Sequence, residues 1–396
     1  MPPLDGRRIW LVGIGGAGLS AYALLARAWG AEVAGWDRNE TPYLAPVREA
    51  GIEVTISPEP EAPGGWEVFV SSAYPDVRGR PRAELLADLV ASRRAIVVAG
   101  AHGKTTTAAM IAFALRETGR DPSWIVGGEV PQLGANAGAG EGWLVVEGDE
   151  SDRSVFALRP RVAVVTNVDL DHHSEFGSRA EVEELFEHWL TDVPEVVRGW
   201  ELDPLDAELA VPGEHNRRNA AAAVAALELA GLPRDEAVEA LGAFRGVGRR
   251  FELVGSAAGV EVYDDYAHNP QKLRAAIATA RRRSSGRVLV LFQPHLYSRT
   301  LYSAGDLGRE LAAVDVAVVT DVYPAREHAL EGVTGKLVID ALCDARPGFA
   351  PGWAPMLDDG VRFLVRRAHP GDLVLTVGAG DVDRAARAIL EQLERS

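Results

Sequence analysis

The sequence has few of the residues that mark secreted or nucleic-acid-binding proteins. Its single cysteine, Cys343, excludes an internal disulfide framework and fits a reducing cytoplasm. Acidic residues (57) outnumber lysine and arginine (41), and the formal net charge of -16 argues against nucleic acid, because binding phosphates needs a basic face. We therefore expect a cytoplasmic protein without a nucleic-acid partner.

Long apolar runs are also missing. The apolar stretch that follows residues 1–8 is broken by glycines and is too short for a signal peptide or a membrane span, so we expect no membrane association. Hydrophobic residues make up 47% of the chain and charged residues 25%, as in soluble globular proteins. A length of 396 residues suits two to three domains.

Lysine is rare, with three in the chain, and one of them stands in a glycine loop. An apolar strand at residues 95–99 leads into this loop, and a helical pattern follows it. Loop N–H groups and Lys104 would bind phosphates, and the Thr105 hydroxyl is placed to bind Mg²⁺. Val98 replaces the first glycine of the usual motif, and a simple helix-capping turn is the alternative. The predicted ATP-binding residues here are Gly100, Ala101, His102, Gly103, Lys104, Thr105 and Thr106.

An acidic run follows the next apolar strand. Residues 147–152 contain four acids, and acids at a strand end beside a phosphate loop can hold Mg²⁺, because hard cations prefer carboxylate oxygen. Glu147, first off the strand, is the strongest candidate, and a solvated acidic turn is the alternative for the others. His172 or His173, in the loop after a further strand, would complete the metal shell, although such pairs more often lie at the surface.

The first block combines a strand, a glycine turn and a helix. Residues 13–18 follow the pattern G-x-G-x-x-G, and a second strand ends at Asp37, as in dinucleotide-binding folds. The glycines would also serve close packing of the helix alone. A later strand ends in small hydroxyl residues at the edge where such sheets bind ligands. The candidate substrate-binding residues are Gly15, Gly16, Ala17, Gly18, Asp37, Ser71, Ser72 and Ala73.

The last block begins after a basic hinge, Arg249 and Arg250, flanked by glycines. Four apolar strands there, near residues 260, 290, 318 and 375, each end in a polar loop, which is how an open α/β domain builds a ligand edge. Before the hinge, His215, Asn216 and Asn219 open an alanine-rich helix, and they either face a cleft or cap the helix. We expect domains at residues 1–94, 95–246 and 247–396.

These motifs together resemble the Mur ligases over nearly the whole chain. The resemblance rests on the order of six segments, namely residues 13–20, 100–107, 147–152, 215–216, 264–268 and 292–295. The histidine in the phosphate loop and the Asp-Glu-Ser-Asp, Asp-Asp-Tyr and Gln-Pro-His motifs are most similar to the type that adds L-alanine to UDP-N-acetylmuramate.

The resemblance implies an α/β enzyme of three domains. A Rossmann-like N-terminal domain would hold the UDP-sugar, a central P-loop domain would bind ATP, and a Rossmann-like C-terminal domain would close over ATP and the amino acid. ATP, with Mg²⁺, would phosphorylate the lactyl carboxylate of UDP-N-acetylmuramate, and the amine of L-alanine would attack the acyl phosphate. Neutralising the charges of the ATP phosphates and of the carboxylate would account for most of the rate enhancement.

The resemblance also implies residue roles. Lys104, Glu147, His172, His268, His295 and Arg299 are the catalytic candidates. The metal ligands would be Thr105, Glu147 and His172. Additional ATP contacts would come from His215, Asn216, Asn219, Arg250 and Asp265. Tyr266, His268, His295 and Arg299 match the region that receives the amino acid and the reacting carboxylate.

Two departures and two alternatives accompany this interpretation. Residues 189–212 form only a short connector, where relatives carry a longer segment, and the absence of lysine between Lys104 and Lys272 excludes the carbamylated lysine of several other Mur ligases. A murein tripeptide recycling ligase shares these motifs. A non-catalytic UDP-sugar-binding regulator would fit the shortened central domain, although the intact set of catalytic candidates argues against it.

Overall fold

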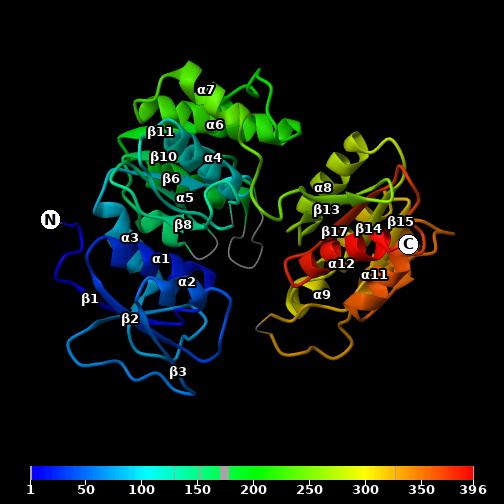
Figure 1. Cartoon of the computed structure of the whole chain (residues 1–396), viewed down its shortest axis with the longest axis horizontal. Coiled ribbons are helices and arrows are strands. Elements are labelled where there is room, and N and C mark those ends of the chain that lie inside the picture. The colour runs from blue at the N-terminus through cyan, green and yellow to red at the C-terminus, as the bar shows by residue number, and fades with distance from the viewer. Residues whose placement is uncertain (1, 129, 151–152, 170–177, 326, 396) are drawn as a thin grey trace. The chain divides into compact units, whose positions relative to one another are not determined.

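The computed structural model contains three α/β sheets, which confirms the predicted fold class (Figure 1). It describes the whole chain except residues 1, 129, 151–152, 170–177, 326 and 396. By its contacts the chain divides into two compact units, residues 1–247 and 248–396. In the described part of the chain, no helix combines the length and apolar character needed to cross a membrane.

The first sheet is parallel throughout, with strand order β3-β2-β1-β4-β5. Its strands are β1 (Arg8–Val12), β2 (Glu32–Asp37), β3 (Glu53–Ile56), β4 (Glu67–Val70) and β5 (Arg80–Pro81). Its helices are α1 (Ala17–Ala28), α2 (Leu44–Glu49) and α3 (Arg82–Ala91). The glycine turn thus lies between β1 and α1, as its pattern predicts, at the carboxyl edge of the sheet.

The second sheet has the order β11-β10-β6-β9-β7-β8 and is parallel except for β8. Its strands are β6 (Ala95–Ala99), β7 (Ser123–Ile125), β8 (Ala137–Gly138), β9 (Leu144–Glu147), β10 (Val162–Val165) and β11 (Glu195–Arg198). Its helices are α4 (Lys104–Glu117), α5 (Arg179–Leu190), α6 (Glu214–Leu229) and α7 (Arg234–Gly242), with 3₁₀ turns η1 (Ser154–Ala157) and η2 (Gly199–Glu201). The short connector therefore contains an edge strand, β11.

The third sheet has the order β12-β13-β17-β14-β15-β16, and its β12 is antiparallel. Its strands are β12 (Glu252–Ala257), β13 (Val260–Asp265), β14 (Val288–Phe292), β15 (Val316–Val319), β16 (Gly352–Trp353) and β17 (Leu373–Val377). Its helices are α8 (Pro270–Arg283), α9 (Tyr297–Leu311), α10 (Lys336–Ala345), α11 (Leu357–Val365) and α12 (Asp383–Glu394). Asn269 caps α8, because its side chain accepts from the Lys272 N–H.

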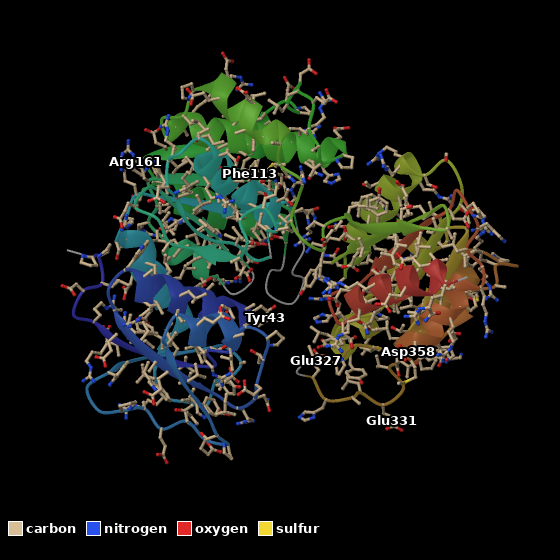
Figure 2. The ribbon with its side chains drawn as sticks, viewed as in Figure 1. Tyr43, Phe113, Arg161, Glu327, Glu331 and Asp358 are labelled. Carbon is tan, nitrogen blue, oxygen red and sulfur yellow. The ribbon has the colours of Figure 1, made fainter. Side chains whose placement is uncertain are left out.

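The strand β6 and the helix α4 are largely buried because the second sheet is covered by helices. All five residues of β6 are buried, and α4 buries ten of its residues against the sheet, α6 and α7. Phe113 of α4, labelled in Figure 2, is 2% exposed and packs on Phe244 at 5.5 Å between ring centroids. This core holds the start of α4 at the sheet edge.

The first two sheets share a hydrophobic core, which accounts for the first compact unit. Helices α1 and α3 contact β8 and η1, and one apolar cluster runs from Leu19 and Leu85 to Ala137 and Val155 (Figure 1). The predicted boundary near residue 94 thus separates two sheets that pack together. The domain limits themselves stay a prediction.

The link between the units is shorter than the predicted hinge. Val247 is 2% exposed and belongs to the core of the first unit. Arg249 is bonded into the second unit through Asp264 and the carbonyl groups of Gly378 and Gly380. The division between the units therefore falls between Val247 and Gly248, and Arg249 is an anchor of the second unit rather than a pivot.

Candidate active site

The phosphate loop joins the end of β6 to the start of α4. Gly100 and Gly103 have φ angles of 120° and 81°, which glycine adopts without steric cost. Gly103 is the N-cap of α4, and Lys104 is its first residue. The positive end of the helix dipole, the first N–H groups of the helix and Lys104 therefore lie together, as an anion site requires.

Two residues that follow β10 hold the phosphate loop in place by hydrogen bonds to His102. Asn167 accepts from the His102 N–H at 3.0 Å and donates to the His102 carbonyl at 2.8 Å. The Thr166 hydroxyl donates to the same carbonyl at 2.6 Å. Sequence reasoning missed both supports, although a polar pair at the end of a buried strand beside β6 was the available signal.

Of the three ATP-binding candidates at the start of α6, one contacts the phosphate loop. Asn219 is 9% exposed, and a Cβ on Gly103 would overlap its Oδ1, so Asn219 packs directly on the phosphate loop. Asn216 instead donates to the Pro212 carbonyl at 2.8 Å. The exposed His215 lies against Gly213 at the first turn of the helix. Adenine contacts by all three stay a prediction.

Two predicted oxygen ligands of the metal lie together, Thr105 in the first turn of α4 and Glu147 at the end of β9. The Thr105 hydroxyl donates to Glu147 Oε1 at 2.9 Å, and the Gly127 N–H donates to Oε2 at 2.7 Å. His172 lies outside the described residues. Among the residues that are described, no group of three or more His, Cys, Asp or Glu is arranged to hold a metal ion.

Lys104 is held by a buried carboxylate. Its Nζ donates to Glu150 at 2.9 and 3.0 Å and to the Gly100 carbonyl at 2.8 Å. Burial alone lowers the pKa of Lys104, but the charges of Glu150, Glu147 and Asp149 raise it above its ordinary value. Burial raises the pKa of Glu150, and Lys104 opposes that shift. The lysine is therefore charged at neutral pH and has an internal counterion.

In the first domain, Asp37 supports the glycine turn. Its carboxylate accepts from the Gly15 N–H at 2.8 Å and from the Tyr74 hydroxyl at 3.1 Å, and the residue is 6% exposed. A Cβ on Gly13 would lie 2.9 Å from both Ser71 and Tyr74, so this position requires glycine. Asp37 thus shapes the turn, and its contact with substrate stays a prediction.

An arginine that no sequence motif singles out lies beside this turn. Gly16 is the N-cap of α1 and Ala17 its first residue. A Cβ on Gly18 would be 2.9 Å from Nη1 of Arg82, at the start of α3. Ser72 and Ala73 follow β4 at the same edge. No local pattern marks Arg82, because its place depends on how α3 packs on α1.

The second unit brings four predicted residues together at the carboxyl edge of its sheet. His268 Nδ1 lies 2.9 Å from the Tyr266 carbonyl, and the rings of His268 and His295 are 6.0 Å apart. Arg299 Nη1 lies 3.1 Å from His295 Nδ1. Burial, with the charges of Lys272 and Arg299, lowers the pKa of His268 well below its ordinary value, so its imidazole is neutral at pH 7.

Two supports of this cluster come from the loop after β15. Tyr323 stacks on His295, with centroids 5.9 Å apart and planes 12° from parallel. Glu327, labelled in Figure 2, accepts from the N–H of Ser298 at 2.9 Å and from its hydroxyl, at the first turn of α9. This contact joins the loop to the turn that carries Arg299.

Asp265 and Arg250 flank the same edge. The Asp265 carboxylate accepts from the N–H groups of Phe251 and Ala267, both at 2.8 Å. Burial raises its pKa to about 6, although Arg250 and the two N–H groups act in the opposite direction. The Arg250 guanidinium lies 5.6 Å from the centroid of the Tyr266 ring. Their proposed ATP contacts stay a prediction.

Three family models match successive parts of the chain. The model described as Mur ligase family, catalytic domain, matches residues 8–94. The Mur ligase middle domain matches residues 98–198, and the Mur ligase, glutamate ligase domain matches residues 249–380. The matches together cover most of the sequence, in the order in which the three sheets occur.

Curated relatives are similar over nearly their whole length. The UDP-N-acetylmuramate--L-alanine ligase of Renibacterium salmoninarum is 39% identical over 452 residues, covering 98% of this chain and 96% of that protein. The ligase of the same name from Rubrobacter xylanophilus is 37% identical, covering 98% and 100%. Both alignments exceed the 396 residues of this chain, so these relatives carry segments that have no counterpart here.

Solved structures show the same fold. The UDP-N-acetylmuramate-alanine ligase MurC of Thermotoga maritima superposes with a TM-score of 0.79 at 27% identity, covering 98% of this chain and 99% of that one. A murein peptide ligase from Psychrobacter arcticus has a TM-score of 0.68 at 22% identity, with 99% of both chains covered. The second match concerns the fold alone.

Proposed function

The chain belongs to the Mur ligase family, and we propose on that premise that it joins L-alanine to the lactyl carboxylate of UDP-N-acetylmuramate, using ATP and forming ADP. This is a step in the synthesis of peptidoglycan precursors, and we place it in the cytoplasm. The observation that carries the proposal is the contact between Thr105, in the first turn of α4 after the phosphate loop, and Glu147 at the end of β9. It joins a phosphate site to a carboxylate suited to a hard cation.

The central domain would activate the carboxylate by phosphoryl transfer. Lys104 and the N–H groups at the start of α4 neutralise the transferred phosphoryl group as it moves between two anions. The product is an acyl phosphate on the lactyl carboxyl group. Its carbon is electrophilic, because phosphate is a far better leaving group than the oxygen of a free carboxylate.

A Mg²⁺ ion fits the donors at this edge. Thr105 and Glu147 offer adjacent oxygen ligands, and Glu147 is oriented by the Gly127 N–H. We include His172 as a third ligand. Such an ion neutralises phosphate charge and orients the transferring group.

The second unit would receive the amino acid. A neutral His268 can accept a proton, which the amine of L-alanine must lose before or during attack on the acyl carbon. Arg299, beside His295, can bind a carboxylate of either substrate. Arg250 and Asp265 would contact ATP, and Tyr266 would line the amino-acid side.

The UDP-sugar would bind at the glycine turn of the first domain. The start of α1 supplies N–H groups, and Arg82 near Gly18 adds a positive charge that suits a diphosphate. Asp37 holds Gly15 in position. Ser71, Ser72 and Ala73 would complete this site.

The proposal is tested by ADP release with UDP-N-acetylmuramate and one acceptor at a time. We expect ADP release with L-alanine. The rates with glycine and with serine then show how large a side chain the acceptor site admits. Release driven by a murein tripeptide but not by L-alanine would make the protein a recycling ligase. Binding of the UDP-sugar without ADP release from any acceptor would make it a regulator.

The metal role is tested by Glu147→Gln. We expect this change to raise the Mg²⁺ concentration for half-maximal ADP release by about tenfold or more, because one charged ligand is lost. An unchanged Mg²⁺ titration would move the ligand role to another acid of the same loop, Asp149 or Glu150.

A further inference from the structure

The ammonium group of the phosphate-loop lysine is already paired with acceptors of the chain. Both oxygens of Glu150 and the Gly100 carbonyl lie within 3.0 Å of Lys104 Nζ. The Glu150 side chain is 3% exposed and that of Lys104 is 14% exposed, so little water screens the pair. A carboxylate of the chain thus occupies the lysine in the ligand-free protein.

A nucleotide phosphate needs the same ammonium group. Lys104 is the first residue of α4, so its charge and the N–H groups of that helix end serve one anion site. Because Glu150 already neutralises the charge of Nζ, a phosphate gains the full charge of Lys104 only when the Glu150 carboxylate withdraws. The displaced carboxylate stays in the loop that follows β9, three residues from Glu147, and both carboxylates repel the incoming phosphates.

We propose that Glu150 is a specificity-determining residue, an internal competitor of the nucleotide phosphates that makes binding depend on an accompanying divalent cation. The inference rests on the proposed ATP site. Metal-free nucleotide would have to pull Lys104 from Glu150 and then face two uncompensated carboxylates. A nucleotide that arrives with Mg²⁺ brings the positive charge that offsets them.

The opposite role is also physically reasonable and gives the opposite result. In protein kinases a glutamate holds the phosphate-binding lysine in position, so that loss of the glutamate weakens nucleotide engagement. Glu150 differs because both of its carboxylate oxygens lie within 3.0 Å of Lys104 Nζ, directly beside the phosphate loop. Competition predicts tighter metal-free binding when the charge is removed, and positioning predicts weaker binding.

The test is ADP binding to the full chain by calorimetry, with Mg²⁺ and with EDTA. We expect Glu150→Gln to tighten metal-free ADP by about tenfold or more and Mg²⁺-bound ADP by much less, so that the ratio of the two Kd values shrinks. Unchanged or weaker metal-free binding by Glu150→Gln would overturn the proposal and favour the positioning role.

Controls separate this outcome from other causes. Asp149→Asn removes one charge from the same loop as Glu150 without removing the partner of Lys104. We expect it to change the Kd of metal-free ADP clearly less than Glu150→Gln does. Should Glu150→Gln fail to fold, Glu150→Met fills a similar volume without charge and carries the same expectation. If the unaltered protein does not bind ADP with Mg²⁺ at all, the proposed ATP site is wrong. If it binds ADP but Glu150→Gln leaves the ratio of the two Kd values unchanged, only the role of Glu150 is wrong.

Discussion

At the residue scale, we expect Lys104 to affect stability as well as the proposed catalysis, because its charge is paired inside the protein. We expect Lys104→Ala to abolish ADP release, since the transferring phosphoryl group loses its cation. We also expect the free energy of unfolding to fall by about 3–5 kcal/mol, the usual cost of leaving one partner of a buried ion pair alone. Urea denaturation measures the second effect.

The double variant Lys104→Ala/Glu150→Gln separates the two effects. It removes both charges, so stability should largely return while ADP release stays absent. A single variant as stable as the unaltered protein would show that the pair does not form in solution.

Asp265 is expected to influence the pH dependence of stability. Its pKa is about 6 in the fold, above its ordinary value, so the folded protein binds a proton more tightly than the unfolded chain does. The stability that this group contributes is therefore fully present below about pH 4 and is lost as the pH rises to about 6. Asp265→Asn should flatten the profile of unfolding free energy between these values. An identical slope in both proteins would contradict the shift.

At the element scale, α4 has a positive-φ glycine beyond each end, and the two differ in their surroundings. Gly103 has φ 81° and touches Asn219, whereas Gly119 has φ 70° and no atom within 4 Å of the point where a Cβ would lie. Gly119→Ala should cost about 1–2 kcal/mol of unfolding free energy, from backbone strain alone. Gly103→Ala should cost more and weaken ADP binding, because Asn219 must move.

Denaturation of the two variants, with ADP binding measured on each, checks this expectation. Gly119→Ala is the matched control, and its ADP affinity should stay unchanged because it lies at the far end of the helix. Equal ADP affinity in both variants would mean that the contact between the loop and α6 does not shape the nucleotide site.

At the scale of the whole molecule, the proposed groups are divided between two compact units. The proposed nucleotide-binding residues belong largely to the first unit, and the predicted histidines and Arg299 belong to the second, so we expect turnover to need groups from both units. Closure would also keep water from the acyl phosphate. We expect ATP with UDP-N-acetylmuramate to reduce the radius of gyration in small-angle scattering, compared with the protein without ligands.

Gly248 is where this motion is expected to occur, because Val247 and Arg249 are each held by their own unit. Gly248→Pro restricts φ at that point and should reduce ADP release while leaving UDP-N-acetylmuramate binding intact. Scattering that does not change with both ligands bound would mean that no closure accompanies binding.

Much of the fold follows from local pattern. The apolar strands expected near residues 260 and 290 form β13 (Val260–Asp265) and β14 (Val288–Phe292). Buried parallel strands are apolar throughout, so their signal is strong. The strands β8 and β16 have two residues each and exist only through pairing with a neighbour. No window of sequence marks such strands.

The sequence by itself determined the class of protein and the chemical groups of its site, because glycine loops and polar strand ends follow from the order of residues along the chain. Tertiary structure alone decided which groups meet. Glu150 pairs with Lys104 across 46 positions, Arg82 reaches Gly18 through helix packing, and Arg249 is anchored by Asp264. Such contacts depend on three-dimensional distance, which local periodicity does not encode.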